Sequence, residues 1–372
     1  MREVVILGVG LHPFGRFPEK SIEDLGRTAV ANALEEANVP FKDIQAAYVG
    51  HVYQAMGTGH KVVTEFGMTG IPIINQEVAC TSSTQGLMRA AYEIASGLYD
   101  VVLAVGVEKM QRGLLAGTTQ AGSFEEVMGF AVMPATYAMK SRKHMQLYGT
   151  TMEQLAICSV KEHKNGVLNP NAQYRKECTV EEVLNSRMIA DPITLLMCSP
   201  TSDGASAAVI CAKDKAAKYV SKRPITIAGC SASSGKYHKG EDSEFSAMAD
   251  VGDLAYEKAG IGPQEVDVAQ IHDAFSPAEI FTPEALGFVP EGEGGPWIER
   301  GEMDIGGKIP INTDGGLVSR GHPVGATGLA QIAEIVCQLR GEAGARQVPN
   351  DPKVGLCHNA GIGGMMVTIL KR

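Results

Sequence analysis

Short apolar runs alternate with segments of helical periodicity in the first hundred residues. The runs EVVILGVG (3–10), AAYVGHVY (46–53) and DVVLAVGV (100–107) have the length and composition of strands that are buried on both faces. Between them, residues 21–37 and 84–98 carry apolar residues at the spacing of one helix face. This alternation predicts a layered α/β fold.

The pattern then recurs later in the chain. ANVPFKDIQAAYV (37–49) lies over AGIGPQEVDVAQI (259–271) without a gap. A second internal alignment matches the expected helix GLMRAAYEIA with GLAQIAEIVC, and in it Cys80 aligns with His322. Two similar halves related by a pseudo-twofold axis would bring these two residues into one cleft.

The repeat suggests how the chain is divided. We expect an N-terminal half formed by residues 1–111 with 197–221, and a C-terminal half formed by residues 222–372. Residues 112–196 differ from both halves in composition, with polar and Met-rich helical stretches. We expect this segment to be an inserted loop or lid region, because long segments with structure of their own often cover binding sites.

Composition and charge narrow the class of protein. The formal charge of −9 comes without a long basic run, which argues against a nucleic-acid partner. Since no apolar stretch reaches 18 residues and no secretory signal is evident, we expect a cytoplasmic protein without a membrane span. The eight cysteines include no C-x-x-C pair, so we expect neither a metal site nor disulfides.

Cys80 lies in EVACTSSTQGL, just before the helix expected over 84–98. We expect the hydroxyls of residues 81–83 to cap that helix, and its N-terminus to favour a thiolate at Cys80. A nucleophile is one interpretation of this residue. The other is an ordinary buried thiol, since free cysteine is among the most buried residue types.

Three later tracts carry further reactive side chains: IHDAFS (271–276), SRGHPVGATG (319–328) and GLCHNAGIGG (355–364). Taken singly, His272 could be a core histidine, His358 a spectator and Cys357 a buried strand thiol. His322 differs, because Gly321 and Pro323 fix the backbone on either side of it at the mouth of a helix. A rigidly held histidine at that place favours a functional role.

Together, VACTSS, HDAF, GHPVGATG and CHNAGIGG resemble, in order and spacing, the four active-site loops of the thiolase superfamily. The central tract from YGTTMEQLA to PTSDGASA is similar to the sterol-carrier-type thiolases and their bacterial and archaeal relatives, and the similarity covers nearly the whole chain. The resemblance implies a five-layer αβαβα fold and Claisen chemistry on acyl-coenzyme A thioesters. Coenzyme A would be a co-substrate, with no bound cofactor.

The resemblance also implies residue roles. Cys80 matches the nucleophile that is acylated, His322 the histidine that activates it, and Cys357 the second cysteine, which moves a proton at the α-carbon of the substrate. The backbone N–H groups of Cys80 and Asn359 would form one oxyanion hole, and His272 with His322 would hold the enolate oxygen. His358 is a possible accessory residue.

The chain departs from both branches of the superfamily. It has HDAF where ordinary thiolases have N-E-A-F, and Ala274 where sterol-carrier-type enzymes usually have cysteine. We therefore keep three hypotheses: a 3-oxoacyl-coenzyme A thiolase, a decarboxylating condensation of the ketosynthase kind that would not need Cys357, and a retro-aldolase or scaffold that acts with a partner subunit.

The expected partners also follow from the resemblance. It implies a homodimer or a dimer of dimers. Relatives in this branch often assemble with a small zinc-ribbon and OB-fold protein, and the lack of an obvious basic phosphate site in this sequence fits such a partner.

Overall fold

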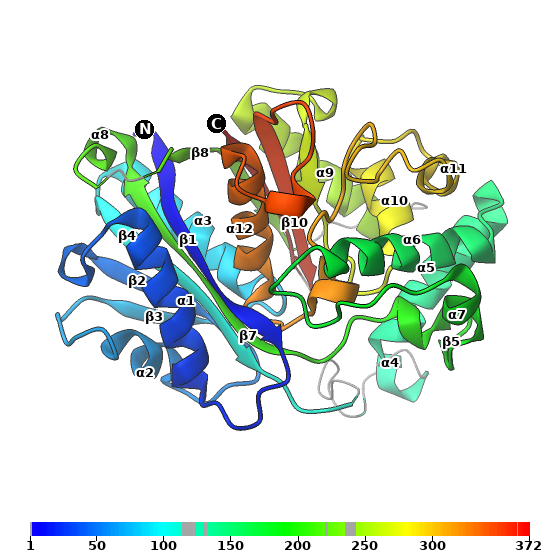
Figure 1. Cartoon of the computed structure of the whole chain (residues 1–372), viewed down its shortest axis with the longest axis horizontal. Coiled ribbons are helices and arrows are strands. Elements are labelled where there is room, and N and C mark those ends of the chain that lie inside the picture. The colour runs from blue at the N-terminus through cyan, green and yellow to red at the C-terminus, as the bar shows by residue number, and fades with distance from the viewer. Residues whose placement is uncertain are drawn as a thin grey trace.

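The computed structural model describes residues 2–113, 122, 124–128, 132–219, 222–234, 243–362 and 364–372 (Figure 1). Part of the insertion expected at 112–196 thus lies outside the described residues, as do residues 1, 220–221, 235–242 and 363 of the two expected halves. The boundaries expected from the sequence remain predictions.

Nine strands form one continuous sheet in the order β3-β2-β4-β7-β1-β8-β11-β10-β9. Its N-terminal part consists of β1 (Val4–Gly15), β2 (Ala46–Gly50), β3 (Ile73–Gln76), β4 (Val101–Lys109) and β7 (Asp203–Ala212). Its C-terminal part consists of β8 (Ile225–Ser233), β9 (Val268–Gln270), β10 (Val354–Gly361) and β11 (Gly364–Lys371). The two parts join only where Val5 and Ile6 of β1 pair with Thr226 and Ile225 of β8.

Helices cover both outer faces and fill the space between the two parts of the sheet. The outer helices are α1 (Ile22–Ala37) and α2 (Thr58–Thr64) on one side, and α9 (Ser243–Ala259) and α10 (Ala278–Ala285) on the other. Between the sheets lie α3 (Ser82–Ser96) and α12 (Thr327–Arg340), seen at the centre of Figure 1. The layered α/β architecture predicted from the sequence is confirmed, and it has five layers.

The alternation of side chains along the strands explains the order of the layers. On β10, Leu356 joins the apolar cluster beneath α9 and α10, whereas Cys357 joins the cluster around α3 and α12. On β11, Ile369 and Leu370 divide in the same way. Successive side chains of a strand point to opposite faces, so strands with apolar residues on both faces require a helical layer on each side.

The segment between the two halves packs on the C-terminal side of the molecule (Figure 1). It contains α4 (Phe124–Val127), α5 (Met133–Tyr148), α6 (Met152–Val167), α7 (Val180–Asn185) and a small ribbon of β5 (Met188–Ala190) and β6 (Ile193–Thr194). Buried side chains of α5 and α6 share one apolar cluster with α9 and α10. The remaining helices are α8 (Lys213–Ala216), α11 (Gly294–Glu299), a π-helix (Gly316–Arg320) and short 3-10 turns at 41–43, 195–197, 263–265 and 344–346.

Glycines let the two central helices approach closely. A Cβ on Gly328 of α12 would lie 2.6 Å from Thr84 of α3, and a Cβ on Gly106 of β4 would lie 2.4 Å from the carbonyl of Gly325. Across the same contact, the Leu329 N–H donates to Ser83 Oγ at 3.2 Å. The loops that enter the two helices therefore meet in the middle layer.

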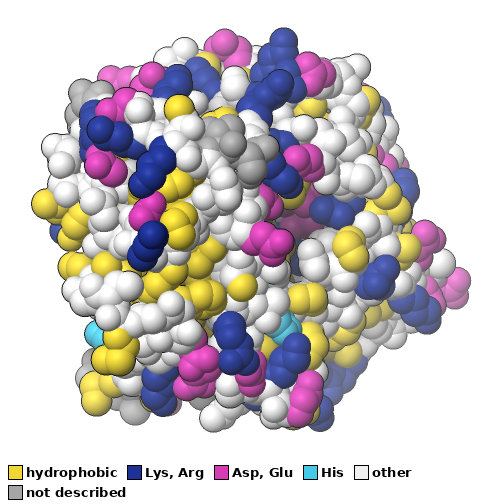
Figure 2. Space-filling model, turned by 60° about the vertical axis from the view of Figure 1, so that its left-hand side comes forward, with side chains coloured by type: hydrophobic (Ala, Val, Ile, Leu, Met, Phe, Trp, Pro, Cys, Tyr) yellow, Lys and Arg dark blue, Asp and Glu magenta, His cyan; other side chains and the backbone are white. Residues whose placement is uncertain are grey.

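The face of the molecule in Figure 2 carries charged side chains of both signs. On the face in Figure 2, Lys and Arg side chains lie among Asp and Glu side chains rather than in a continuous stripe. Within the described ranges, no helix combines the length and the apolar character that crossing a bilayer requires.

Candidate active site

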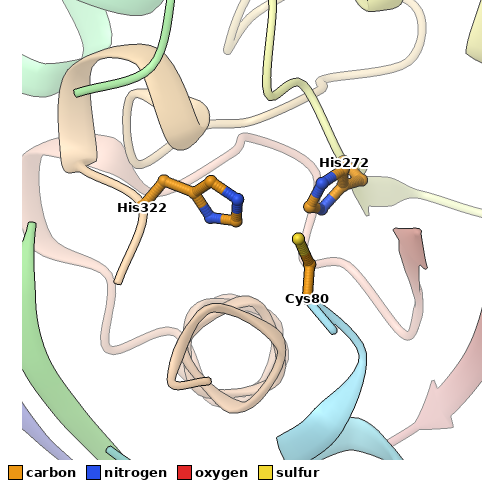
Figure 3. Close-up of side chains that lie close together, drawn as sticks. All are labelled: Cys80, His272 and His322. Atoms are coloured by element: carbon orange, nitrogen blue, oxygen red, sulfur yellow. The ribbon is translucent and has the colours of Figure 1, made fainter. Parts of the chain in front are cut away.

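Three side chains from distant parts of the chain meet at the centre of the fold. The Cys80 sulfur and ring nitrogens of His272 and His322 all lie within 4.8 Å of one another. The two imidazole rings are 5.1 Å apart between centroids, edge to face. Figure 3 shows the sulfur pointing toward the space between the rings.

Cys80 follows a strained turn at the entrance to α3. Ala79 has a φ of 46°, in the left-handed region that costs a non-glycine residue about 1–3 kcal/mol. Thr81 Oγ1 donates to the Val78 carbonyl at 2.7 Å, and Ser82 Oγ donates to the Ala79 carbonyl at 2.6 Å. The capping predicted for residues 81–83 is therefore wrong for Thr81 and Ser82, because their hydroxyls bind the preceding turn instead of the first turn of the helix.

Burial opposes the thiolate that the helix N-terminus was expected to favour at Cys80. Burial raises the pKa of the Cys80 thiol to about 12, and the negative charges of Glu108 and Glu77 add to this effect. Loss of hydration outweighs the helix N-terminus here, since burial disfavours the charged form. A thiol with a raised pKa keeps its proton near neutral pH.

His322 is held by a hydrogen bond at one ring nitrogen. Its Nδ1 lies 2.7 Å from Thr327 Oγ1, and this hydroxyl donates its single proton to the Pro323 carbonyl at 3.0 Å. The hydroxyl can therefore only accept from the ring, which places the ring proton on Nδ1. We infer that His322 Nε2 carries a lone pair.

His272 is held in the opposite tautomer. Gln331 Nε2 donates to the carbonyls of Ile271 and His358, so Gln331 Oε1 must accept from Asn359 Nδ2, at 3.0 Å. The same Asn359 amide lies 3.2 Å from His272 Nδ1 and donates to it. His272 Nε2 therefore carries the ring proton and is a hydrogen-bond donor.

Both rings are neutral at ordinary pH. Burial lowers the pKa of His322 to about 3, with a contribution from the positive charge of Arg320. Burial also lowers the pKa of His272 well below its usual value, and the neighbouring His322 adds to the shift. The site thus combines a neutral thiol, a neutral base and a neutral donor.

The structure does not bring Cys357 to this site. A Cβ on Gly361 would lie 2.8 Å from the Cys80 nitrogen, so the end of β10 touches the nucleophile loop. Cys357 lies four residues earlier on the same strand, about 13 Å away at the rise of an extended chain. Its side chain packs into the central apolar cluster with Leu329 and Ile332, and it is 2% exposed. The predicted acid/base role is therefore corrected: Cys357 is a buried strand thiol.

Asn359 and His358 both lie against His272. The backbone that closely approaches Cys80 is that of Gly361, while the Asn359 side chain binds His272. His358 is buried, its Nδ1 accepts the His272 N–H at 3.4 Å, and burial lowers its pKa to about 4. The oxyanion role of the Asn359 backbone remains a prediction.

Several supporting residues were not found from the sequence. The buried carboxylate of Glu108 accepts from the backbone N–H groups of Val52, Tyr53 and Gly325 and from Gln54 Nε2, at 2.6–3.0 Å. It thereby joins the loop after β2 to the loop that carries His322. Glu108 is a charged residue at the end of the apolar run of β4, so the sequence alone could have singled it out. Thr327 and Gln331 could not be singled out in this way, because they look like ordinary helix residues.

Two clusters of the described residues have metal-ligating side chains. One is the set Cys80, His272 and His322, and the other is the buried set Glu162, Asp273 and Glu279. Spacing rules for metal sites missed both, because one member of each cluster, Cys80 or Glu162, lies more than a hundred residues before the other two. The expectation that the protein holds no metal remains a prediction.

A cavity of about 570 Å³ opens between α5 and α9–α10. Its walls include Lys140, Lys143, Phe281 and Glu284. The ring of Tyr137 lies 6.3 Å from that of Phe281 and 4.7 Å from that of Phe275, which belongs to the HDAF loop. A row of aromatic rings thus leads from the cavity wall toward the His272 segment.

Comparison with protein families gives two matches. The thiolase N-terminal domain matches residues 4–214, and the thiolase C-terminal domain-like family matches residues 229–372. The chain belongs to the thiolase family. Membership makes it an enzyme of the thiolase type, an acyltransferase, and it confirms the resemblance seen in the four loops.

Curated relatives of this thiolase cover nearly the whole chain. Acetyl-CoA acetyltransferase of Methanothermobacter thermautotrophicus is 40% identical, over 97% of each chain. Sterol carrier protein 2 of Bos taurus is 40% identical, over 99% of this chain and 72% of its own length. Benzoylsuccinyl-CoA thiolase subunit BbsB of Thauera aromatica is 39% identical, over 97% of this chain and 95% of its own.

Solved structures agree on the fold. The Ltp2-ChsH2(DUF35) aldolase matches with a TM-score of 0.87 and 25% identity, covering 99% of this chain and 97% of that one. Acat5 thiolase from Ascaris suum, solved in complex with coenzyme A, has a TM-score of 0.73 and 19% identity over the whole of both chains. The predicted thiolase fold is confirmed.

We predict that Thr327→Val slows acylation of Cys80 by an acyl-CoA about tenfold to a hundredfold, with little change in KM. A buried His322 Nδ1–H without an acceptor costs about 1–3 kcal/mol, and 1.4 kcal/mol is a factor of ten. Rapid-quench mass spectrometry measures the rate. Thr327→Ser, which keeps the hydroxyl, is the matched control, and equal rates in the two variants would contradict the tautomer assignment.

We also predict that alkylation of Cys80 by iodoacetamide accelerates continuously as pH rises from 7 to 10. The raised thiol pKa leaves only a small thiolate fraction throughout this range. Peptide mass spectrometry separates Cys80 from the other half-buried thiols, Cys178, Cys198 and Cys337. A rate that levels off below pH 8 would indicate a preformed thiolate–imidazolium pair instead.

Proposed function

We propose that this thiolase cleaves a 3-oxoacyl-CoA with coenzyme A, or runs the reverse Claisen condensation, through an acyl group on Cys80. The observation that supports this most is the placement of one thiol against two histidines of opposite tautomer. One histidine can accept the thiol proton, and the other can donate to an oxygen of the substrate. A nucleophile, a base and an electrophilic donor are the parts that acyl transfer requires.

In the first half-reaction, His322 Nε2 takes the proton of Cys80 as the sulfur attacks the 3-oxo carbon. The developing oxyanion lies at the backbone N–H of Cys80. The bond between the α-carbon and the 3-oxo carbon then breaks, and its electron pair forms the enolate of the leaving thioester. His272 Nε2–H donates to the enolate oxygen, and the His322 imidazolium returns its proton to the α-carbon.

In the second half-reaction, the thiol of coenzyme A gives its proton to His322 and attacks the acyl-Cys80 thioester. The Cys80 sulfur leaves and takes that proton back. Each proton accepted by His322 is returned within the same half-reaction. No second cysteine is needed, which is consistent with the burial of Cys357.

We propose that the acyl-CoA approaches through the cavity between α5 and α9–α10. Lys140 and Lys143 could meet phosphate groups there, but Glu284 and Glu291 line the same cavity and offset their charge. A site of mixed charge attracts phosphate weakly. This supports a partner that contributes to coenzyme A binding, as does the similarity to a solved aldolase whose name joins Ltp2 to ChsH2(DUF35).

A decarboxylating condensation of the ketosynthase kind is the second candidate. The cluster of one cysteine and two histidines favours it, because that reaction forms its enolate by loss of CO₂ and needs no base at the α-carbon. A retro-aldolase that acts with a partner is the third, supported by the same aldolase neighbour. These reactions differ in whether Cys80 is acylated and whether CO₂ is released.

We further propose a homodimer that forms along β3 and a cytoplasmic location. Strand β3 is an edge of the described sheet, its four residues are half-buried, and Cys80 follows it by four residues. Two nearby loop side chains, Met56 and Met68, are more than 90% exposed. An open strand edge is a natural site for pairing with a second chain.

Incubation with a panel of 3-oxoacyl-CoA and acyl-CoA thioesters, followed by intact and peptide mass spectrometry, should give an acyl adduct on Cys80. Cys80→Ala should abolish the adduct and thiolysis. Cys357→Ala is the matched control and should keep both, since its thiol is remote from the reacting atoms. Loss of thiolysis in a folded Cys357→Ala would contradict the one-base mechanism.

Other outcomes of this experiment separate the candidates. Adduct formation with CO₂ release from a malonyl thioester, and no thiolysis, would support the ketosynthase reaction. A folded protein that takes no acyl group from any thioester would support the retro-aldolase.

Sedimentation analysis should give the mass of a dimer. Asn75→Pro on β3 should shift the mass toward a monomer, because proline removes a backbone donor from the edge strand. A monomeric wild-type protein would contradict the dimer.

The need for a partner is tested by an activity assay. Full turnover by the purified chain alone would contradict it.

A further inference from the structure

A buried cluster of carboxyl groups lies behind the two histidines. Glu162 comes from α6, Asp273 from the HDAF loop and Glu279 from α10, and all three are fully buried. Oxygen atoms of the three groups lie within 4.8 Å of one another. Both oxygens of Glu162 and one of Glu279 have no hydrogen-bond donor in the described residues.

This cluster holds the backbone on both sides of His272. Asp273 accepts the Leu317 N–H at 2.8 and 3.0 Å, which ties the HDAF loop to the π-helix just before His322. On the other side, Asn312 Oδ1 accepts the Ile271 N–H at 2.9 Å, while Asn312 Nδ2 donates to Glu279 at 3.0 Å. Gly316 permits this approach, because a Cβ there would lie 2.1 Å from Asp273.

The charges in the cluster do not balance if every carboxyl group is ionised. Lys161 donates to one oxygen of Glu279 at 3.0 Å and gives that carboxyl group a positive partner. Arg320 forms its ion pair with Asp314 at 2.5 Å. Glu162 and Asp273 would then face each other as two buried negative charges, an arrangement that costs several kcal/mol per unpaired ion. A proton between them removes this cost.

We propose that Glu162 keeps its proton, donates it to Asp273, and so acts as a positioning residue for both His272 and His322. The donation leaves Asp273 with a single negative charge that can hold the Leu317 N–H. In this way α6, which belongs to the segment between the two halves, fixes the relative position of the base and the donor. The catalytic part of this inference rests on the proposed function.

Electrostatics supports this geometry. Burial raises the pKa of Glu162 well above its usual value, and the charges of Asp273 and Glu279 raise it further. Burial also raises the pKa of Asp273, while the Leu317 N–H and the positive charge of Arg320 lower it in part. The charged and titratable groups that act on the cluster from the packed elements are Lys161, Cys158, Asp304, Arg320 and Asp314.

The raised pKa of Glu162 sets the direction in which stability depends on pH. Because the folded state keeps a proton that the unfolded chain loses near pH 4.5, Glu162 favours folding at low pH and loses this contribution as pH rises through its folded pKa. Above that pH, two negative charges would oppose each other behind the histidines. We expect both melting temperature and kcat to fall on the alkaline side.

The matched variants are Glu162→Gln and Glu162→Leu. The glutamine can still donate to Asp273 and cannot ionise, so kcat should stay within about twofold of wild type and the alkaline fall should be reduced. The leucine leaves Asp273 without a donor, and kcat should fall at least tenfold with KM changed less than threefold. A merely structural role would change the melting temperature without separating kcat from KM.

Infrared difference spectroscopy tests the proton directly and without any substrate. The wild-type protein at pH 7 should show the C=O stretch of a buried protonated carboxyl group that is missing from Glu162→Gln. No such band in the difference spectrum would overturn the proposal, even if Glu162→Leu fails to fold. A band with no acyl adduct on Cys80 would uphold the shared proton and reject the proposed function.

A bound cation is the competing explanation of the cluster. If Glu162→Gln were as impaired as Glu162→Leu, and elemental analysis found a metal in the wild-type protein that the glutamine variant loses, the proposal would be overturned. The test uses the whole purified chain, with calcium and magnesium titrated separately after chelation.

Discussion

The close contact between α3 and α12 is the constraint on which the rest of the molecule depends. Both helices lie in one layer between two parts of a sheet, and each begins at a loop that carries a reactive side chain. Gly328 leaves room for the Thr84 side chain of α3, and Gly106 of β4 leaves room for the Gly325 carbonyl just before α12, at distances that a Cβ would prevent. The five layers therefore serve to place two helix entrances against each other.

Given that contact, the chemistry is set by neutral hydrogen bonds rather than by ion pairs. Thr327 fixes the proton of one histidine and Asn359 fixes the proton of the other, so two identical rings differ in which nitrogen can donate a hydrogen bond. Burial keeps both uncharged and raises the pKa of the thiol. In the proposed reaction, charge develops at the site only with a bound substrate, where the low-polarity surroundings strengthen each new interaction.

The sequence was sufficient for the layers and for the meeting of Cys80, His272 and His322, because each rests on a local pattern or on a motif at a turn. The sequence was insufficient for properties that depend on burial in the folded protein. Helix position suggested a thiolate at Cys80, but the loss of hydration is a property of the assembled fold. Motif alignment placed Cys357 at the site, but strand alternation and four residues of rise place it in the core. The hydroxyls after Cys80 looked like caps, and the strained turn at Ala79 uses two of them instead.

The strained turn and the neutral thiol have a consequence for chemical selectivity. Peroxides and adventitious electrophiles react with thiolates, so a nucleophile that rests protonated is protected from them. Its reactivity appears only when a bound molecule excludes water and presents a carbonyl carbon to the sulfur while His322 is in reach. Oxidative damage to this protein should therefore begin elsewhere than at the sulfur of Cys80, with exposed methionines such as Met56 and Met68 among the more accessible targets.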